Sequence, residues 1–312
     1  YNFLRDMEFN RLLSQAISFY GEDSKNFKEE STKKIATNKI NTKNYESITK
    51  ESDLKKWVKI LNEQSVISVD TETSSLKPSE TDLVGISFSY APNKACYIPL
   101  DHKNQKSLKK KDVIKVIKPI LEDSSIKKVG QNIKFDYIVF KQNGIELNSI
   151  EDTMLISYTL DAGINRHNLD TLSDIHLNHK TISYKDVVGS GKNQLNFSEV
   201  EIDKATEYAA EDADITLRLY KILTSRLDQE KLNKVYEYFE KPMIKLLSKL
   251  ELNGIKINNT QLKKLSKVFE QKIKKIEKEI FLIAKKNFNI GSPKQLGEII
   301  YNELKIAKLK KT

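Results

Sequence analysis

The sequence predicts a mixed α/β domain, in which helices pack on a sheet, followed by a mainly helical segment. Short apolar runs at 66–70, 83–89 and 95–99 are joined by short connections, which is typical of an antiparallel meander. Helical and strand patterns then alternate between residues 111 and 177. Beyond residue 203, apolar residues recur with the helical period over long stretches.

The same periodicity predicts the remaining elements in order. Shorter helices are expected at 53–62, 111–121, 134–142, 152–160 and 169–177, and a fourth strand is expected at 126–129. Long helices are expected at 203–227, 230–252 and 261–286. Residues 1–20 predict a short helical piece, and residues 21–50 are too polar to bury much surface, so a linker is expected there. We therefore divide the chain into residues 1–50, 51–228 and 229–312.

Composition narrows the class of protein. The 312 residues carry a net charge of +10, which favours a polyanionic partner such as nucleic acid, although a general bias toward lysine could also produce it. The single cysteine, Cys96, excludes an internal disulfide. No apolar stretch is long enough to span a membrane, and no signal peptide is visible, so a cytoplasmic protein is expected. The chain begins with Tyr1 instead of Met, which suggests a piece of a longer protein.

A first acidic motif, Asp70-Thr71-Glu72, ends the apolar strand 66–70. If the strand continues, alternation places Asp70 and Glu72 on the same face. Neighbouring carboxylates repel each other unless a cation neutralises them or one stays protonated, so a site for a hard metal ion is one interpretation. An ordinary acidic turn is the other.

A second acid, Asp136, falls in the first turn of the helix predicted at 134–142. An acid in this position favourably opposes the helix dipole, which is a sufficient reason for its presence. Asp136 becomes a site candidate only in combination with the other motifs.

A third acid lies on the helix predicted at 203–227. Asp212 falls on the apolar stripe of this helix, one turn after Tyr208. An ionised carboxylate on a face that turns toward the core is unfavourable unless it is paired or binds a metal. Its neighbours Glu211 and Asp214 point elsewhere and are expected to be solvated.

Three separate elements thus supply four carboxylates, and only the fold can bring them together. Asp70, Glu72, Asp136 and Asp212 suit two divalent ions roughly 3.5–4 Å apart, which activate a water molecule and stabilise a departing oxygen in attack at phosphorus. Tyr208 could orient the attacking water through a hydrogen bond.

These motifs resemble a known family. The runs at 69–73 (VDTET), 130–136 (GQNIKFD) and 208–214 (YAAEDAD) are similar to the three motifs of the DEDD-superfamily exonucleases, in the subclass with Tyr in the third motif. All four acids and the Tyr are present, in the family's order. The resemblance implies a ribonuclease-H-like fold and hydrolysis of nucleic acid from its 3′ end.

The flanking runs extend the resemblance. The run at 3–9 (FLRDMEF) and those at 240–243 (EKPM), 252–255 (LNGI) and 292–296 (SPKQL) are similar to the sequences around the proofreading domain in the bacterial DNA polymerase I family. This implies a 3′-5′ exonuclease domain at 51–228 and the incomplete beginning of a polymerase domain, near the thumb, at 229–312. The catalytic motifs of the palm and fingers are absent, so polymerase activity would belong to the parent protein, in replication and repair of DNA.

The resemblance also implies roles for single residues. Asp70 would bridge two ions of Mg²⁺ or Mn²⁺, Glu72 and Asp212 would bind the first ion, and Asp136 would hold the second largely through water. Four other positions match residues that grip a single-stranded 3′ end in a monomeric enzyme: Leu76, Gln131, Asn132 and Tyr184. Relatives usually have Phe at the position of Tyr184, and a Tyr ring also stacks on bases. Leu76 and Tyr184 could equally be packing residues.

Three other hypotheses remain. One is an RNA-trimming 3′ exonuclease of the RNase D type. Another is a module that holds DNA without cleaving it, and a third is a structural spacer, which would bind no metal. The polymerase-like flanks argue against the first hypothesis, and the complete set of acids argues against the second.

Overall fold

The structure is a computed structural model that describes residues 39–103, 105–191 and 194–305, together with Leu4, Met7, Phe9, Leu12 and Leu13. It divides into two compact units, Tyr1–Leu252 and Asn253–Thr312. Most of the helical piece expected at 1–20 and most of the linker expected at 21–50 lie outside the described residues. In the described part, no helix is both long and apolar enough to cross a membrane.

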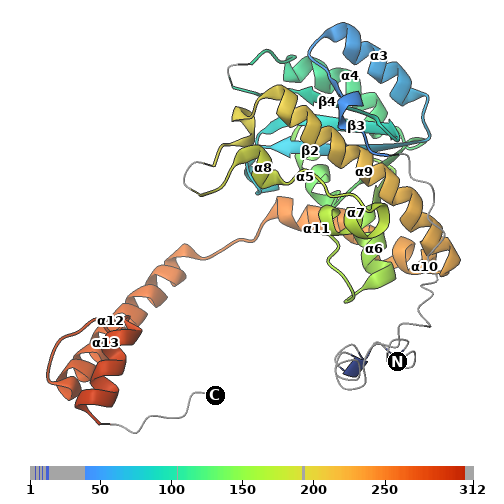
Figure 1. Cartoon of the computed structure of the whole chain (residues 1–312). Coiled ribbons are helices and arrows are strands. Elements are labelled where there is room, and N and C mark those ends of the chain that lie inside the picture. The colour runs from blue at the N-terminus through green and yellow to red at the C-terminus, as the bar shows by residue number, and fades with distance from the viewer. Residues whose placement is uncertain are drawn as a thin grey trace. The chain divides into compact units, whose positions relative to one another are not determined.

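A six-stranded mixed sheet lies at the centre of the first unit, with strand order β1-β4-β3-β2-β5-β6 (Figure 1). The strands are β1 (Glu46–Ser47), β2 (Val66–Thr73), β3 (Leu83–Ala91), β4 (Lys94–Pro99), β5 (Lys127–Gly130) and β6 (Ile150–Asp152). Strands β2, β3 and β4 form the predicted antiparallel meander. Strands β5 and β6 continue the sheet parallel to β2. The carboxyl ends of β2, β4, β5 and β6 therefore lie at one edge.

Strand β1 lies where a linker was predicted. Glu46 and Ser47 pair with Cys96 and Tyr97 of β4, after a single 3-10 turn, η1 (Thr42–Asn44). A strand of two residues is too short to show alternation, so the sequence pattern could not reveal it.

The helices of the first unit follow the predictions closely. They are α3 (Glu51–Asn62), α4 (Lys110–Glu122), α5 (Lys134–Gln142), α6 (Thr153–Asp161), α7 (Leu169–Leu177), α8 (Tyr184–Val188), α9 (Ile202–Gln229), α10 (Asn233–Val235) and α11 (Lys241–Asn253). The short elements β6 and α8 were not predicted. The helix expected at 230–252 is present but begins later, since α10, a π-helical turn at Tyr236–Glu240 and α11 follow one another without a break, and Lys231, with φ of 59°, separates them from α9.

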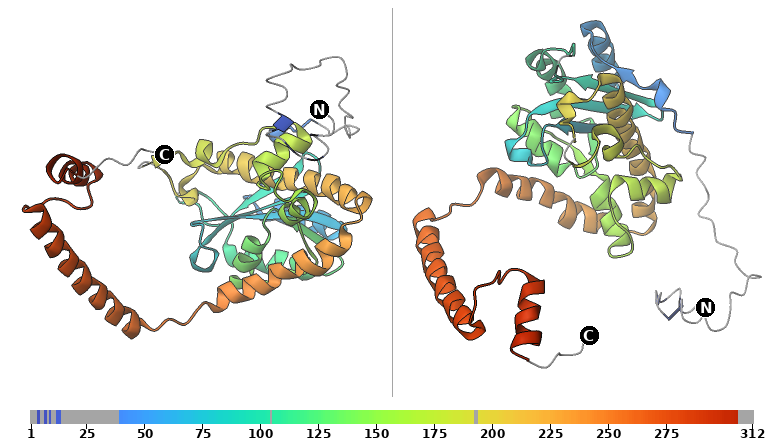
Figure 2. Two further views of the ribbon diagram at one scale, coloured as in Figure 1. Left: turned by 90° about the horizontal axis from the view of Figure 1, so that it is seen from below. Right: turned by 60° about the vertical axis from the view of Figure 1, so that its left-hand side comes forward.

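Helices cover both faces of the sheet. On β2, Val69 belongs to the hydrophobic cluster that contains Trp57 of α3 and Ile117 of α4. The adjacent Ser68 points to the opposite face and bonds to α9. Helix α9 crosses that face, as two further views also show (Figure 2), and α6 and α7 pack beside it.

The segment after α10 is tied to the end of β6. It is a π-helical turn, η5 (Tyr236–Glu240), in which Tyr236 is buried. The Tyr236 hydroxyl donates to Glu151 Oε2 at 3.0 Å and accepts the N–H of Asp152, also at 3.0 Å. Lys241 donates to the other Glu151 oxygen at 2.8 Å. The chain that leaves the sheet is thus bonded to its last strand.

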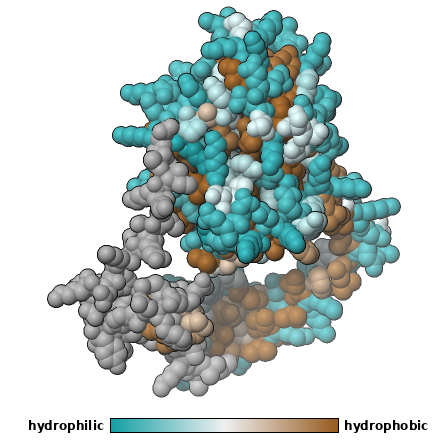
Figure 3. Space-filling view, turned by 90° about the vertical axis from the view of Figure 1, so that its right-hand side faces the viewer, coloured by the Kyte–Doolittle hydropathy of each residue, from teal (hydrophilic) through white to brown (hydrophobic). Residues whose placement is uncertain are grey.

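The second unit is helical, as predicted. It contains α12 (Asn259–Ala284), α13 (Pro293–Glu298) and the π-helical turn η6 (Ile299–Glu303). Asn258 and Ser292 cap α12 and α13 through hydrogen bonds from the backbone of Gln261 and Gln295. In the first unit, the surface shown in Figure 3 is largely hydrophilic with separate apolar areas, which agrees with the lysine-rich composition.

Candidate metal centre and active site

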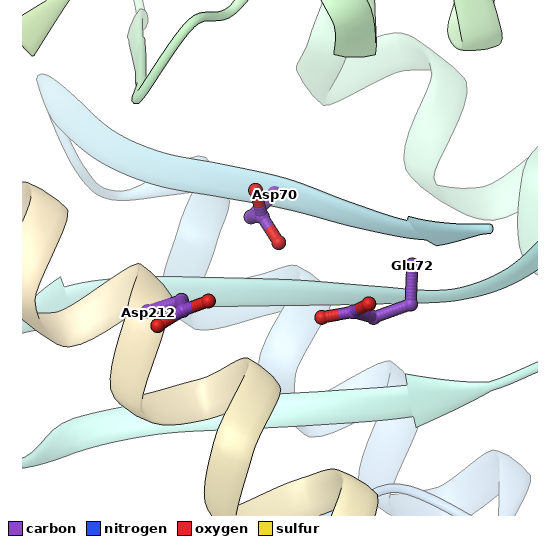
Figure 4. A group of neighbouring side chains, drawn as sticks. All are labelled: Asp70, Glu72 and Asp212. Carbon is purple, nitrogen blue, oxygen red and sulfur yellow. The ribbon is translucent and has the colours of Figure 1, made fainter. Parts of the chain in front are cut away.

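Three carboxylates meet on the face of β2 that α9 covers. Asp70 and Glu72 are two residues apart on β2, so their side chains leave the same face of the strand. Ser68 lies on that face as well, and its hydroxyl donates to the carbonyl oxygen of Ala213 at 2.6 Å, which fixes this turn of α9 against β2. Asp212 therefore lies opposite the two strand acids. One carboxylate oxygen from each of the three residues lies within 4.8 Å of the others (Figure 4).

Asp136 comes from α5 and is bonded to Thr71, the residue between Asp70 and Glu72 on β2. It is buried in the first turn of α5, where its Oδ1 accepts the backbone N–H of Thr71 at 2.9 Å and the Thr71 hydroxyl at 2.6 Å. Burial, and then repulsion from Asp70, raises the pKa of Asp136 well above its usual range. The fold thus brings three of the four predicted acids into one group and holds the fourth at Thr71, close enough to act on Asp70 electrostatically.

The group of three acids is strongly destabilised in its ionised form. Burial raises the pKa of Asp70 to about 7. Burial, followed by repulsion from Asp70, raises the pKa of Glu72 and of Asp212 well above the usual range. Carboxylate oxygens are the ligands that Mg²⁺ and Mn²⁺ prefer, and a cation would offset the repulsion. The three residues therefore fit a divalent metal ion.

We expect Asp70 to make the metal-free chain less stable as the pH rises from about 4, where an unfolded Asp titrates, to about 7, its pKa in the folded chain. Across this interval the folded chain keeps a proton that the unfolded chain releases, so the contribution is complete below the lower value and lost above the upper one. Thermal melts in chelator, compared between the wild type and Asp70→Asn, measure the pH dependence that is lost together with this carboxylate.

The pH slope of Tm should be less negative in Asp70→Asn than in the wild type, and Mn²⁺ should raise the wild-type Tm most at the upper pH values. Identical pH slopes in the two proteins would contradict the raised pKa of Asp70.

Tyr208 lies one turn before Asp212 on α9, and its hydroxyl is hydrogen-bonded to the Asp212 carboxylate. Burial, and then the charge of Asp212, raises the pKa of Tyr208, so the phenol stays protonated. Its ring centroid lies 6.0 Å from those of both Tyr184 and Phe197. Tyr184 stacks on Phe197 with an interplanar angle of 9° and keeps 39% of its surface exposed. A partly exposed aromatic ring thus lies next to Tyr208 and close enough to Glu72 for the two to interact electrostatically.

The other residues predicted to contact DNA differ in exposure and in how many hydrogen bonds they already make inside the protein. Leu76, in the turn after β2, is 90% exposed. The Gln131 side chain is already bonded inside the protein, since it donates to the His167 carbonyl oxygen at 2.7 Å and accepts from Thr153 at 2.5 Å. Asn132 adopts φ of 60°, and its N–H donates to Asp152 at 3.1 Å. Leu76 is accessible to a ligand, whereas Gln131 would have to exchange a partner.

The prediction that Glu211 and Asp214 are solvated is wrong. Both are buried, at 1% and 0% exposure. Glu211 accepts from the His179 ring at 2.9 Å and from the Ile182 N–H at 2.7 Å. Asp214 accepts two hydrogen bonds from Arg218, both at 3.0 Å. Because these partners satisfy both carboxylates, they can lie inside.

Two contributors to the site were missed in the sequence. Phe197, under Tyr184, lies in a 3-10 turn that begins with a capping box between Asn196 and Glu199, and this Asn-x-x-Glu pattern was visible. Asp152 holds the turn at Asn132 and also caps α6. An Asp as the first residue of the helix predicted at 152–160 could have indicated the cap, but not the contact with Asn132.

Comparison with known proteins agrees with this architecture. The 3′-5′ exonuclease family matches residues 45–228, and DNA polymerase family A matches residues 259–312. DNA polymerase I of Rhizobium leguminosarum is 42% identical over 279 residues, which are 83% of this chain and 28% of that protein. DNA polymerase I of Pseudomonas aeruginosa is 34% identical over 99% of this chain and 34% of that protein. The chain thus spans about a third of the length of these relatives.

Solved structures show the same fold. The POL domain of Pol1 from M. smegmatis matches with a TM-score of 0.65 and 21% identity over 85% of this chain and 42% of that chain. Brucella melitensis NrnC with bound Mg²⁺ matches with a TM-score of 0.51 and 23% identity over 67% of this chain and 92% of that one. The fold and the exonuclease match define a nuclease domain, and its three neighbouring carboxylates fit a metal ion. The chain belongs to the 3′-5′ exonuclease family, which confirms the predicted fold class and the resemblance to DNA polymerase I.

Proposed function

We propose that the chain removes nucleotides from the 3′ end of DNA by metal-dependent hydrolysis, as the proofreading segment of a DNA polymerase I. The convergence of Asp70, Glu72 and Asp212 in a member of the exonuclease family supports this proposal most directly. A group of buried acids with raised pKa values is unfavourable in a purely structural role.

The acids would hold two divalent ions, Mg²⁺ or Mn²⁺. Asp70, Glu72 and Asp212 would bind one ion, and Asp70 together with Asp136, the latter through water, would bind the second. When bound, the ions would activate the attacking water and stabilise the departing 3′ oxygen. Asp136 keeps its bonds to Thr71 in this arrangement, which suits an indirect contact.

Tyr208 would orient the attacking water. Its hydroxyl is a hydrogen-bond donor next to Asp212, and its raised pKa keeps the proton on the phenol. Tyr208 thus acts by geometry and not as a general base.

Leu76 and Tyr184 would contact the last bases of the strand, together with the Gln131–Asn132 turn. Both side chains are exposed, as this role requires. Stacking on an aromatic ring tolerates any base, which suits an enzyme that must remove any nucleotide.

DNA is the proposed substrate, because the two relatives described above are DNA polymerases by name and the chain carries a charge of +10. We further propose that residues 51–228 form the exonuclease domain and residues 229–312 begin a polymerase domain. Polymerase activity would then reside in the longer parent protein, which would act as a monomer in the bacterial cytoplasm.

The test is incubation of the purified chain with 5′-labelled single-stranded DNA and Mg²⁺. A ladder that shortens from the 3′ end, and that disappears with a chelator, is the expected result. Readdition of Mg²⁺ or Mn²⁺ should restore the ladder.

The same assay with an RNA of identical sequence separates the alternatives. Faster shortening of the RNA would indicate the RNase D type. Binding of DNA without shortening, in a folded protein, would indicate a non-catalytic holding module and would refute the proposal.

A further inference from the structure

Glu211 connects the acids of α9 to the chain segment that carries Tyr184. It is 1% exposed and directly precedes Asp212, yet its side chain turns away from the three acids and toward the connection between α7 and α8. Its two oxygens are used separately: Oε1 accepts from the His179 ring at 2.9 Å, and Oε2 accepts the Ile182 N–H at 2.7 Å. One carboxylate therefore fixes both ends of the segment 179–182.

That segment determines where Tyr184 lies. Ile182 is two residues before Tyr184, and the intervening Ser183 caps α8, since its Oγ accepts the Asp186 N–H at 3.3 Å and its hydroxyl donates to the Asp186 carboxylate at 2.7 Å. Helix α8 begins at Tyr184, so a shift of the Ile182 backbone moves the Tyr184 ring. The ring stacks on Phe197 and leaves one part of its surface open beside Tyr208.

The arrangement gives α9 two functions in consecutive residues. Asp212 points into the metal centre, while Glu211 holds the aromatic residue proposed to stack on the terminal base. Because the Ile182 N–H would otherwise have no comparable charged acceptor, loss of the Glu211 charge should release the segment.

We propose that Glu211 is a positioning residue for recognition of the 3′ end, which acts through Tyr184 and not on the metal centre. The proposal rests on the proposed function, since it takes Tyr184 as a DNA contact.

The experiment is a double-mutant cycle in the full 312-residue chain with Glu211→Gln, Tyr184→Ala and the double variant. Glutamine keeps the size of the side chain but offers one acceptor oxygen instead of two. KM for a single-stranded oligonucleotide should rise about 5- to 10-fold in each single variant, as expected for a lost stacking contact, with kcat within about 3-fold. The double variant should be no weaker than Tyr184→Ala alone.

A binding measurement tests the role of Glu211 separately from the proposed hydrolysis. The Kd of a fluorescent oligonucleotide, followed by anisotropy in chelator, should show the same non-additive pattern without any hydrolysis. If the wild type binds but does not hydrolyse the oligonucleotide, the proposed function fails while the coupling between Glu211 and Tyr184 is still decided by Kd.

Asp214→Asn is the matched control, because Asp214 is also buried on α9 next to Asp212 but bonds to Arg218 on another side. Its effect on Kd should be small and should add to that of Tyr184→Ala. If Glu211→Gln does not fold, His179→Gln replaces it, since the 27%-exposed His179 side chain tolerates change more readily.

Three results would overturn the inference. The first is an effect of Glu211→Gln on kcat alone. The second is a double variant whose Kd change equals the product of the single changes. The third is a Tyr184→Ala variant that binds DNA as tightly as the wild type.

Discussion

Replacing Asp212 with asparagine is expected to lower kcat for 3′-end hydrolysis by at least about 10³-fold, which corresponds to ~4 kcal/mol of transition-state stabilisation. Asp212 supplies one of the three carboxylates whose oxygens gather within 4.8 Å, and an amide is a neutral and weaker ligand for a divalent cation. The same change should stabilise the metal-free protein at pH 8, because it removes a buried charge whose pKa is strongly raised. Initial rates in Mg²⁺ and thermal melts in chelator measure the two effects.

The control for this prediction is Asp214→Asn, two residues further along α9. Asp214 accepts hydrogen bonds from Arg218 and from the Tyr45 hydroxyl, each at 3.0 Å, and lies outside the group of three acids. Loss of its charge beside buried Arg218 should lower the free energy of unfolding by about 2–4 kcal/mol, while kcat stays within about 3-fold of the wild type. Equal losses of activity in the two variants would show that Asp212→Asn acts by distorting α9.

Gly85→Ala is expected to lower the free energy of unfolding by at least about 3 kcal/mol. A Cβ at Gly85 would lie 2.0 Å from the Tyr97 hydroxyl oxygen and 2.2 Å from Cζ of the same ring. Tyr97 cannot move aside easily, because it is fully buried and its hydroxyl is hydrogen-bonded to His102 Nε2 at 2.8 Å. Urea denaturation measures the loss of stability.

Activity should fall in Gly85→Ala as well, since Gly85 pairs with Glu72 in the β2–β3 register. Gly297→Ala is the matched control. The nearest atom to its added Cβ, Cδ2 of Tyr301, lies at 3.9 Å, and alanine favours the helix α13 by up to about 1 kcal/mol. If Gly85→Ala unfolded at the same urea concentration as the wild type, the predicted clash with Tyr97 would be contradicted.

The parts of the site that sequence predicted are those set by local periodicity. Alternation along β2 orients Asp70 and Glu72 together, and the helical period places Tyr208 and Asp212 on one stripe of α9. Both patterns extend over only a few residues, so they are visible without knowledge of the fold. The bounds of α5 and α7 were likewise predicted correctly, because their apolar faces are well marked.

The parts that failed depend on contacts between distant residues. Asp214 is four residues from Arg218, a pair that sequence alone cannot distinguish from an ordinary surface ion pair. Its burial depends on Tyr45 and Asn93, which are 169 and 121 positions away. The position of Asp136 on Thr71 requires β2 and α5 to be docked first. No periodicity encodes such distances.

The anchorage of Tyr236 on β6 determines where an independent nuclease fragment can be cut. The exonuclease match ends at residue 228, and a protein truncated there would lack the Tyr236 hydroxyl that accepts the Asp152 N–H and the Lys241 ammonium group that forms a salt bridge with buried Glu151. Asp152 in turn holds the turn at Asn132, so the damage would reach the substrate side of the domain. A fragment that ends at Leu252, the boundary of the compact unit, keeps all of these bonds. A fragment for expression and crystallisation should therefore extend past residue 228, where the exonuclease match ends, to Leu252.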